Sequence, residues 1–275
     1  QPNSAYSLPI LSGSNPDLQP EKSDSYTVGA VIEPRFIPGL SVSVDWYKIS
    51  VKDVIVALSA QSIANSCYDQ PSLDNPFCGL FERYTGPGEG PLGTQPGQIL
   101  ANSLLSAGFN FASRERKGID INATYRTDIG GFARLNTNLI YTHNFKISNY
   151  ENPTLPDFEN RILGELGDPK DEFLWSVDLT RGPITLGYQM RYIGEMWTGA
   201  YEDFNALQDR PPQNEDFADI RKYPATFYHD VRVEWDLKNG AGIGRDFQFY
   251  LGVDNLLNTH PPLGLAGTGT GGITD

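Results

Sequence analysis

The sequence predicts an all-β fold: the wall of an antiparallel transmembrane β-barrel, with about eight long strands, short periplasmic turns and long extracellular loops. Three observations support this prediction. Apolar and polar residues alternate with a period of two in eight segments, as in strands with one apolar and one polar face. The clearest segment, 132–147, is longer than the usual strand of a soluble protein. The links between segments alternate between short and long, as in outer-membrane barrels.

The alternating segments follow one another along the chain. In order, they are 25–36, 40–51, 119–126, 132–147, 173–180, 184–192, 227–238 and 247–253. The second segment changes parity at Trp46–Tyr47, where a bulge or the emergence of the strand from the membrane would explain the change. A further short strand is expected at 99–105, inside the first long link.

The links sort by length. Short links follow the odd-numbered segments, at 37–39, 128–131, 181–183 and 239–245, and long links follow the even-numbered ones, at 55–112, 149–168 and 199–221. The short links are rich in Gly and two of the four contain Pro, which favours tight turns. Odd-numbered segments are therefore expected to run toward the periplasm and even-numbered ones toward the outside. A soluble sandwich also alternates its faces, but its loops need not sort by length.

The two faces of the segments differ in chemistry. The polar face carries Arg126, Arg134, Lys146, Asp178, Arg191, Asp230, Arg232, Glu234 and Asp236. The apolar face carries aromatic residues near the segment ends: Trp46, Tyr125, Tyr141, Trp175, Tyr192 and Trp235. Aromatic girdles at a lipid–water boundary have this pattern. The alternative is that these aromatic residues belong to an ordinary core.

Composition narrows the functional class. The chain has 21 Lys and Arg against 34 Asp and Glu, a net charge of −13, which argues against a nucleic-acid partner. No run of 18 apolar residues provides a transmembrane helix. The first residues, Gln1–Ser4, contain neither the basic nor the apolar region of a signal peptide, so none is expected.

The two cysteines, Cys67 and Cys78, lie close together in a loop rich in Pro, Asn, Asp and Gly. An even number of cysteines outside any strand predicts a disulfide that closes a surface loop in an oxidising compartment. Two free thiols are the alternative. The spacing is too wide for a zinc knuckle, and no histidine lies nearby.

Three motifs resemble TonB-dependent receptors. Asn15-Pro16-Asp17-Leu18-Gln19-Pro20-Glu21, followed by 25–29, resembles the signature that ends an extracellular loop and opens a barrel strand in that family. Val253-Asp254-Asn255-Leu256-Leu257-Asn258 resembles a motif of a late strand, and Gly118-Ile119-Asp120 resembles a recurring strand start. The three motifs occur in the expected order, and the resemblance spans essentially the whole chain.

The resemblance implies a 22-stranded barrel with an N-terminal plug domain, which imports a scarce ligand with force from an inner-membrane TonB complex. Residues 1–275 are then expected to be the C-terminal portion of the barrel, without the plug domain, the TonB box or the final strand. It also implies the outer membrane of a Gram-negative bacterium. The expected partners are outer-membrane lipid and lipopolysaccharide, the receptor's own plug, the TonB complex and a small-molecule nutrient.

The long loops contain candidate ligand-binding residues: Tyr150, Arg161, Arg191, Trp197 and Tyr201. Aromatic rings stack on sugars or on the rings of a siderophore, and arginines recognise anionic groups. The alternative for these residues is girdle or loop packing. The acidic residues of the loops, such as Glu215 and Asp216, are interpreted as a solvated rim or, alternatively, as a site for divalent cations among lipopolysaccharide phosphates.

Two other functions are alternatives to uptake of a siderophore, carbohydrate or similar nutrient. A complete eight-stranded barrel with a structural or adhesion role requires the first and eighth segments to pair. An enzyme is not expected, because the sequence has only three histidines and neither a GxSxG nor an HExxH motif. The sequence accordingly predicts no catalytic residue, metal ligand or cofactor.

Overall fold

The computed structural model describes residues 8–68, 71–75, 77–238 and 246–262. The chain divides into two compact units. The first, called the loop unit below, comprises Gln1–Asp24, Ser50–Arg114 and Asn149–Asn160. The second, called the wall unit, comprises Ser25–Ile49, Glu115–Ser148 and Arg161–Asp275.

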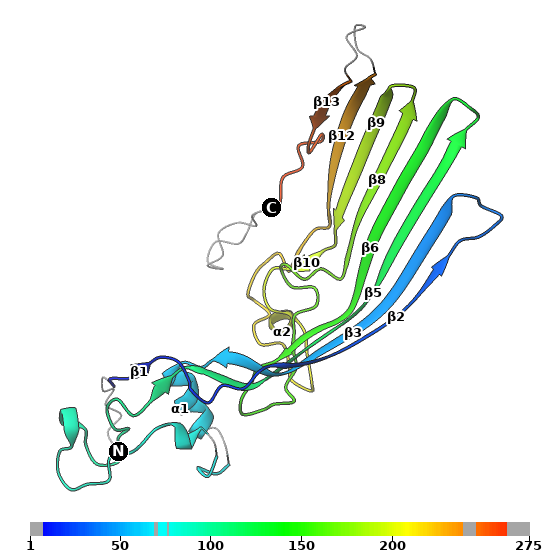
Figure 1. The fold of residues 1–275 in the computed structure, drawn as a ribbon. Helices are drawn as coiled ribbons and strands as arrows, with labels where there is room; N and C mark the ends of the chain where they lie inside the picture. The colour runs from blue at the N-terminus through cyan, green and yellow to red at the C-terminus, as the bar shows by residue number, and fades with distance from the viewer. Residues whose placement is uncertain (1–7, 69–70, 76, 239–245, 263–275) are drawn as a thin grey trace. The chain divides into compact units, whose positions relative to one another are not determined.

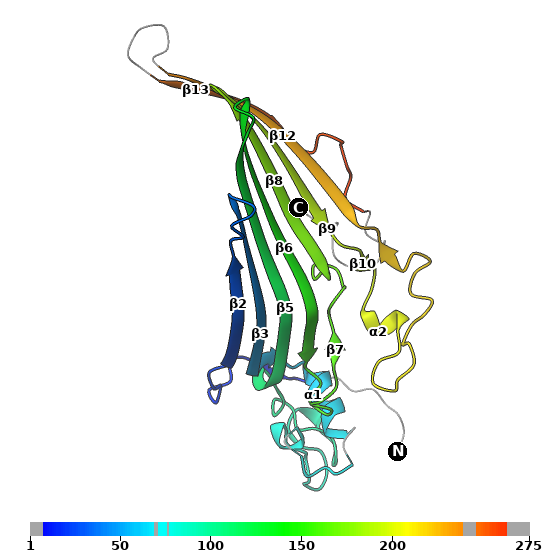
Figure 2. The same cartoon turned by 90° about the vertical axis from the view of Figure 1, so that its right-hand side faces the viewer.

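The predicted antiparallel sheet is confirmed (Figure 1). Its long strands are β2 (Lys22–Ile32), β3 (Leu40–Ala57), β5 (Gly108–Ile129), β6 (Ala133–Tyr150), β8 (Asp171–Arg181), β9 (Ile184–Ile193), β12 (Thr226–Leu237) and β13 (Phe247–Val253). They pair in sequence order, and the short strand β7 (Asn160–Arg161) pairs with β6. Figure 2 shows the same succession of strands after a quarter turn. Each alternating segment of the sequence thus corresponds to one strand.

The sheet is open. Strands β2 and β13 are the two ends of the strand order, so the described strands do not pair into a closed ring. Every residue of β2 and of β13 is exposed, as expected for unpaired edges. A complete eight-stranded barrel requires its first and eighth strands to pair. In the structure these strands, β2 and β13, do not pair with each other.

The structure changes several boundaries inside the first long link. Strand β5 begins at Gly108, eleven positions before the predicted start at Ile119. The predicted strand at 99–105 is not formed as expected: Ile99 makes a single bridge with Arg83, and Leu105–Ser106 (β4) pairs in parallel with Leu11–Ser12 (β1). The helix α1 (Ala60–Tyr68) was not predicted, and two short 3₁₀ turns, Cys78–Leu80 and Pro91–Gly93, follow it.

Strand β3 runs unbroken through Trp46–Tyr47, where the change of parity occurs. The Trp46 ring faces the Lys117 ammonium at 5.8 Å, and the Tyr47 hydroxyl donates a hydrogen bond of 2.9 Å to Asn144. A Cβ at Gly118 would meet the Tyr47 ring, so the adjacent residues Lys117 and Gly118 contact opposite faces of β3. Tyr47 therefore belongs to the polar face of the wall.

Aromatic side chains form a row across four strands on the apolar face of the wall. Tyr141, Phe173, Tyr192 and Phe227 are successive partners in the strand register. The rings of Phe173 and Tyr192 stack at 4.9 Å, and Phe227 lies 4.9 Å from Tyr192. Phe227 is 42% exposed and the other three rings are half-buried, so the row is not fully buried. We call these four residues, which lie toward the long loops, the loop-side aromatic row.

A second aromatic group lies nearer the short turns. Trp235, 45% exposed, faces Phe249 across β12 and β13 with ring centroids 5.9 Å apart. Trp235 follows Phe227 by eight residues, which is roughly 26 Å along a strand. With a strand tilt of about 40°, the two aromatic levels are separated by roughly 20 Å, close to the height of an apolar membrane band. The spacing supports the interpretation of these residues as girdles.

The loop unit has its own apolar core. Its buried members are Leu58, Ile63, Cys67, Phe81, Ile99 and Leu104. Helix α1 begins where the Ser59 hydroxyl oxygen accepts the N–H of Ser62, and it turns Ile63 and Cys67 to one side because they are four residues apart. All of these residues belong to the loop unit, and their packing stabilises the longest loop of the chain.

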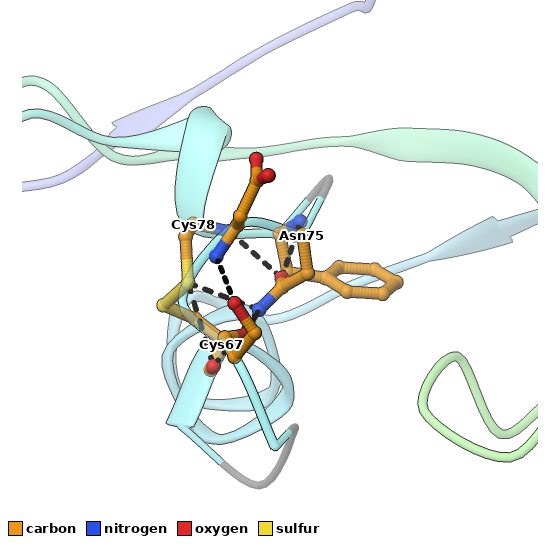
Figure 3. The surroundings of a disulfide bond; sticks show 6 residues. Cys67, Asn75 and Cys78 are labelled. Atoms are coloured by element: carbon orange, nitrogen blue, oxygen red, sulfur yellow. Dashed lines mark hydrogen bonds between the residues drawn. A yellow bond between two sulfur atoms is a disulfide. The ribbon is translucent and has the colours of Figure 1, made fainter.

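The predicted disulfide between Cys67 and Cys78 is confirmed (Figure 3). It joins the end of α1 to the following 3₁₀ turn. Asn75 lies inside the closed loop: its amide group donates to the Cys67 carbonyl oxygen at 3.1 Å, and its side-chain oxygen accepts from the Cys78 N–H at 3.2 Å. The covalent bond and these hydrogen bonds fix the same turn.

The Asn15–Glu21 motif packs within the loop unit through hydrogen bonds. The Asn110 side chain accepts the Gln19 N–H at 2.8 Å and donates to the carbonyl oxygens of Gln19 and Asp53, both at 2.7 Å. The Glu21 carboxylate accepts the N–H of Ile55 at 2.9 Å. The motif thus joins the N-terminal segment to the C-terminal end of β3 and the start of β5.

Candidate ligand-binding site in the long loops

The candidate site is built on the link between β9 and β12. This link contains β10 (Met196–Trp197), the single turn α2 (Tyr201–Phe204) and β11 (Lys222–Tyr223). Strands β10 and β11 pair antiparallel and close the base of the loop. The Trp197 N–H also donates to the Gly164 carbonyl oxygen at 2.6 Å, which ties this loop to the link between β6 and β8.

Aromatic rings and cations gather on this frame. We call the group the loop cluster: Arg161, Trp197, Tyr201, Phe204, Phe217, Arg221 and Lys222. Trp197 stacks on Phe204 at 5.7 Å and meets the edge of Tyr201 at 5.8 Å. Phe217 meets Phe204 at 5.9 Å. The four rings, all from the link between β9 and β12, are thus connected by pairwise contacts around Phe204 and Trp197.

The cations of the loop cluster lie over its rings. The Arg161 guanidinium lies 4.0 Å from the centroid of Tyr201, and the Lys222 ammonium lies 4.6 Å from that of Trp197. Such contacts are worth roughly 0.5–2 kcal/mol, depending on solvation. Lys222 also forms an ion pair with Glu195. Stacking orients a guanidinium while its in-plane N–H donors keep the geometry that matches carboxylate or phosphate.

Two glutamates hold the backbone of the cluster. Glu202 is only 6% exposed, and its carboxylate accepts the N–H of Arg161 at 2.7 Å. The Glu165 carboxylate accepts the N–H of Tyr201 at 2.8 Å. Burial raises the pKa of Glu165 above its ordinary value of 4.5, and the neighbouring Glu202 raises that pKa further. Each carboxylate thus accepts the backbone N–H of a residue of the loop cluster.

The structure brings together three of the five candidate residues predicted from the sequence. Arg161, Trp197 and Tyr201 all belong to the loop cluster. Arg191 lies apart on β9, on the face that carries Gly187 and Gln189, and it is exposed. Tyr150 ends β6 and belongs to the loop unit.

Sequence reasoning missed Phe204, Phe217, Arg221 and Lys222. The aromatic residues interleaved with acidic ones in 201–217 were a signal for the first two. Nothing local marked Arg221 or Lys222, because they reach Phe204 and Trp197 only through the pairing of β10 with β11.

The polar face of the wall unit has a hollow of about 400 Å³. Arg232 lies in it, bonded to Asp178 at 2.8 Å and paired with Glu234 at 3.2 Å. Gly187 makes room for this arginine, because a Cβ there would come within 2.5 Å of the Arg232 side chain. The hollow is a charged surface held by cross-strand ion pairs rather than an apolar pocket.

Replacing Trp197 by alanine is expected to destabilise the loop cluster by about 2 kcal/mol, because three side chains lose their common ring surface. Trp197→Phe keeps a ring and should cost about half as much. Hydrogen exchange of amides 196–204 and 221–223 measures the effect. Equal rates of amide exchange in Trp197→Ala and Trp197→Phe would show that the ring does not hold the loop together.

The stability of the loop cluster is expected to fall as pH rises above about 4.5. Glu165 binds its proton more tightly in the folded loop, so its contribution is fully present below the unfolded pKa and is lost as pH rises through the folded pKa. Glu165→Gln retains an acceptor for the Tyr201 N–H and should remove this pH dependence. Exchange rates measured from pH 4 to 8, with the exposed Glu215→Gln as a control, test the prediction; an unchanged slope contradicts it.

Among the residues that the structure describes, no helix is long and apolar enough to cross a membrane. Within the same residues, no group of three or more His, Cys, Asp or Glu side chains is arranged to hold a metal ion.

Comparison with solved structures identifies the fold. The FrpB iron transporter from Neisseria meningitidis (F5-1 variant, apoprotein form) is 14% identical, with a TM-score of 0.51 over 90% of this chain and 29% of that one. The outer membrane transporter YddB from Escherichia coli is 8% identical, with a TM-score of 0.53 over 93% of this chain and 31% of that one. The chain spans about three tenths of the length of these structures.

The family assignment comes from the sequence match. A search of curated proteins found no match. The model of the family described as "TonB dependent receptor-like, beta-barrel" matches residues 1–256, which is nearly the whole chain. This family consists of receptors and transporters rather than enzymes. The match, the open antiparallel sheet and the structural neighbours agree, and the chain belongs to the family of TonB dependent receptor-like β-barrels.

Proposed function

We propose that this chain supplies barrel wall and ligand-facing loops for the TonB-dependent uptake of a scarce nutrient across the outer membrane of a Gram-negative bacterium. The observation that carries the proposal is the family match over residues 1–256. The sheet supports it, because eight long antiparallel strands with exposed aromatic rows suit a lipid-facing wall and both edges are open to further strands.

Residues 1–275 are proposed to be the C-terminal portion of a barrel of about 22 strands. The receptor's own plug would fill the lumen, and an inner-membrane TonB complex would supply the force for transport. The charged hollow around Arg232 and Asp178 lies on the polar face of the wall, which would line the lumen. An open sheet in lipid would leave its edge hydrogen bonds unmade, so the transporting unit is the complete barrel.

The ligand is proposed to carry both rings and negative charge, as a siderophore or an acidic carbohydrate does. The loop cluster supports this, because Trp197 and Tyr201 provide ring faces and Arg161 provides a guanidinium oriented by stacking. Arg191 on the polar face would meet the ligand after the loops do. Tyr150 is also proposed to bind the ligand, because it lies where β6 enters a long loop. Packing within the loops explains the same contacts without a ligand. The experiments described next distinguish ligand binding from loop packing.

The test uses the full receptor in its native cell. Uptake of radioactive iron, presented as a panel of siderophores, and of labelled oligosaccharides is compared before and after deletion of the receptor gene. Iron is the first cargo to test, because FrpB is an iron transporter. Loss of uptake of one cargo, and the same loss without a functional TonB complex, supports the proposal. Unchanged uptake of every cargo contradicts it.

A second comparison tests the ligand residues. Arg161→Gln and Arg191→Gln should each weaken uptake of the cargo by about tenfold, since a charge-assisted hydrogen bond contributes about 1.5–3 kcal/mol. Arg210→Gln, an exposed arginine in the same long link as Trp197, is the matched control. If all three variants transport equally, loop packing is the role of Arg161.

A further inference from the structure

The loop unit contains a hollow of about 470 Å³, lined by helix α1 and by the link that follows β6. Ser62, Asn65 and Ser66 of α1 line one part of it, and 151–154 and Phe158 line another. All of its lining residues belong to the loop unit. Its volume lies in the range of small-molecule sites, about 300–1,000 Å³. We call it the amide hollow, because asparagine side chains from both segments line it.

The lining of the amide hollow carries little charge. Among the described residues that line it, Glu151 is the one ionisable group. Its carboxylate is already paired, because the Arg114 guanidinium donates two hydrogen bonds, of 3.1 and 2.8 Å, to its Oε1 atom. The loop cluster, by contrast, carries Arg161, Arg221 and Lys222. The amide hollow therefore suits a neutral ligand rather than an anionic one.

Two asparagines of the amide hollow are held by their oxygen atoms. Asn152 Oδ1 accepts the backbone N–H groups of Thr154 and Leu155 at 3.0 and 3.1 Å. Asn65 Oδ1 accepts from the Gln61 amide group at 2.8 Å. In the part of the chain that the structure describes, neither Asn152 Nδ2 nor Asn65 Nδ2 makes a hydrogen bond. Both amide nitrogens thus remain as donors in side chains whose orientation is fixed.

Ser66 adds a hydroxyl group that can both donate and accept. The residue is only 5% exposed, and its hydroxyl has no hydrogen-bond partner among the described residues. The hydroxyl is not sealed from solvent, and the residue lines the amide hollow, so a ligand there can reach it. The disulfide between Cys67 and Cys78 holds this end of α1. A nearly buried hydroxyl without a partner favours a ligand that bonds to it.

We propose that the amide hollow binds a neutral saccharide. Each sugar hydroxyl both donates and accepts, and the hollow offers amide donors, the Ser66 hydroxyl and the second carboxylate oxygen of Glu151. Phe158 and Pro153 line the same hollow and offer apolar surface to the C–H face of a sugar ring. A site built to bond hydroxyl groups also rejects ligands that lack them, because its polar groups then stay unpaired.

The proposal goes beyond the proposed function. The amide hollow lies in the loop unit, and its ligand differs in charge from the ligand proposed for the loop cluster. Saccharide binding there does not depend on which nutrient the receptor transports.

The test is calorimetric titration of the complete receptor in a detergent without a sugar headgroup. The probes are the neutral trisaccharides maltotriose, cellotriose and xylotriose, and the comparison compounds are trigalacturonate and triglycine. We expect at least one neutral trisaccharide to bind. Trigalacturonate should bind at least about tenfold more weakly, because no cation of the lining compensates its carboxylates.

Replacing Asn65 and Ser66 together by alanine is expected to weaken binding of the neutral trisaccharide about 30-fold, through the loss of two hydrogen bonds. The matched control replaces Ser72 and Gln95 by alanine. Both are exposed residues of the loop unit outside the amide hollow, and the change in affinity should be less than about threefold.

Asn65→Asp keeps the test decisive if the double variant fails to fold. Asn65 is exposed, and the substitution keeps its size while it replaces the amide donor by an acceptor. Binding of the neutral trisaccharide should weaken about tenfold. No binding of any neutral trisaccharide up to about 10 mM, unchanged binding in Asn65→Asp, or equal affinity for trigalacturonate or triglycine would each overturn the proposal.

Arg161→Gln distinguishes this proposal from the proposed function. The variant should weaken uptake of the cargo and leave binding of the neutral trisaccharide unchanged, because Arg161 belongs to the loop cluster and does not line the amide hollow. Loss of trisaccharide binding in this variant would place the saccharide in the loop cluster and overturn the proposal.

Discussion

Replacing Ile63 by alanine is expected to lower the free energy of unfolding of the loop unit by about 2–5 kcal/mol. Ile63 is fully buried at 0% exposure, in a core that also contains Leu58, Cys67 and Leu104. The truncation removes several methyl and methylene groups and leaves a cavity that the surrounding turns fill only in part. Because the core belongs to the loop unit alone, the wall should keep its stability.

Hydrogen exchange of the α1 amides in the complete receptor measures this effect. Gln61→Ala, at an exposed position of the same helix, is the matched control and should cost less than about 0.5 kcal/mol. The electrophoretic mobility of the barrel changes when heating unfolds it, which reports on the stability of the wall. This change should be the same in Ile63→Ala and in the native protein. Exchange that is as slow in Ile63→Ala as in Gln61→Ala would show that the loop is held by something other than its core.

Removing the disulfide is expected to cost the loop unit about 3 kcal/mol in the chain-entropy account. Cys67 and Cys78 are 11 residues apart, and the bond closes the loop in which Asn75 is hydrogen-bonded. The double variant Cys67→Ala, Cys78→Ala should become sensitive to protease within 69–80, whereas the native protein should be cut there only after reduction.

The reductant itself is the control for this second prediction. It should accelerate cleavage of the native protein and leave the rate for the double variant unchanged. If reduction does not accelerate cleavage of the native protein, the hydrogen bonds of Asn75 and the packing of Ile63 suffice to hold the turn. Together with the Ile63 variant, this result divides the stability of the loop between covalent closure and packing.

The strands were predictable because their signal is local. The segment predicted at 247–253 coincides with β13, and the one at 132–147 differs from β6 by a few residues at its end. Period-two alternation records that one face of each strand meets apolar surroundings and the other meets polar ones, whatever the partner strands are. The disulfide was predictable for a similar reason, since two nearby cysteines had no other partner in the sequence.

The start of β5 was not predictable from alternation. Residues 113–117 form a charged run without an apolar face, so the sequence places them neither in the long link 55–112 nor in the strand predicted from Ile119. In the structure they belong to the strand, because Arg114 pairs with Glu151 in the loop unit while Glu115 and Arg116 pair with Lys48 and Asp168 in the wall unit. Such pairing depends on the neighbouring strands, which no local pattern shows.

The sequence by itself determined that this chain is a succession of two-faced antiparallel strands with alternating short and long links, and its motifs indicated the family. Only the tertiary structure decided which side chains meet: Arg161 on Tyr201, Lys222 on Trp197, and Lys48 and Lys146 on Glu115. The physical reason is that face periodicity is written into neighbouring residues, whereas contacts between loops and register between strands depend on residues far apart in the chain.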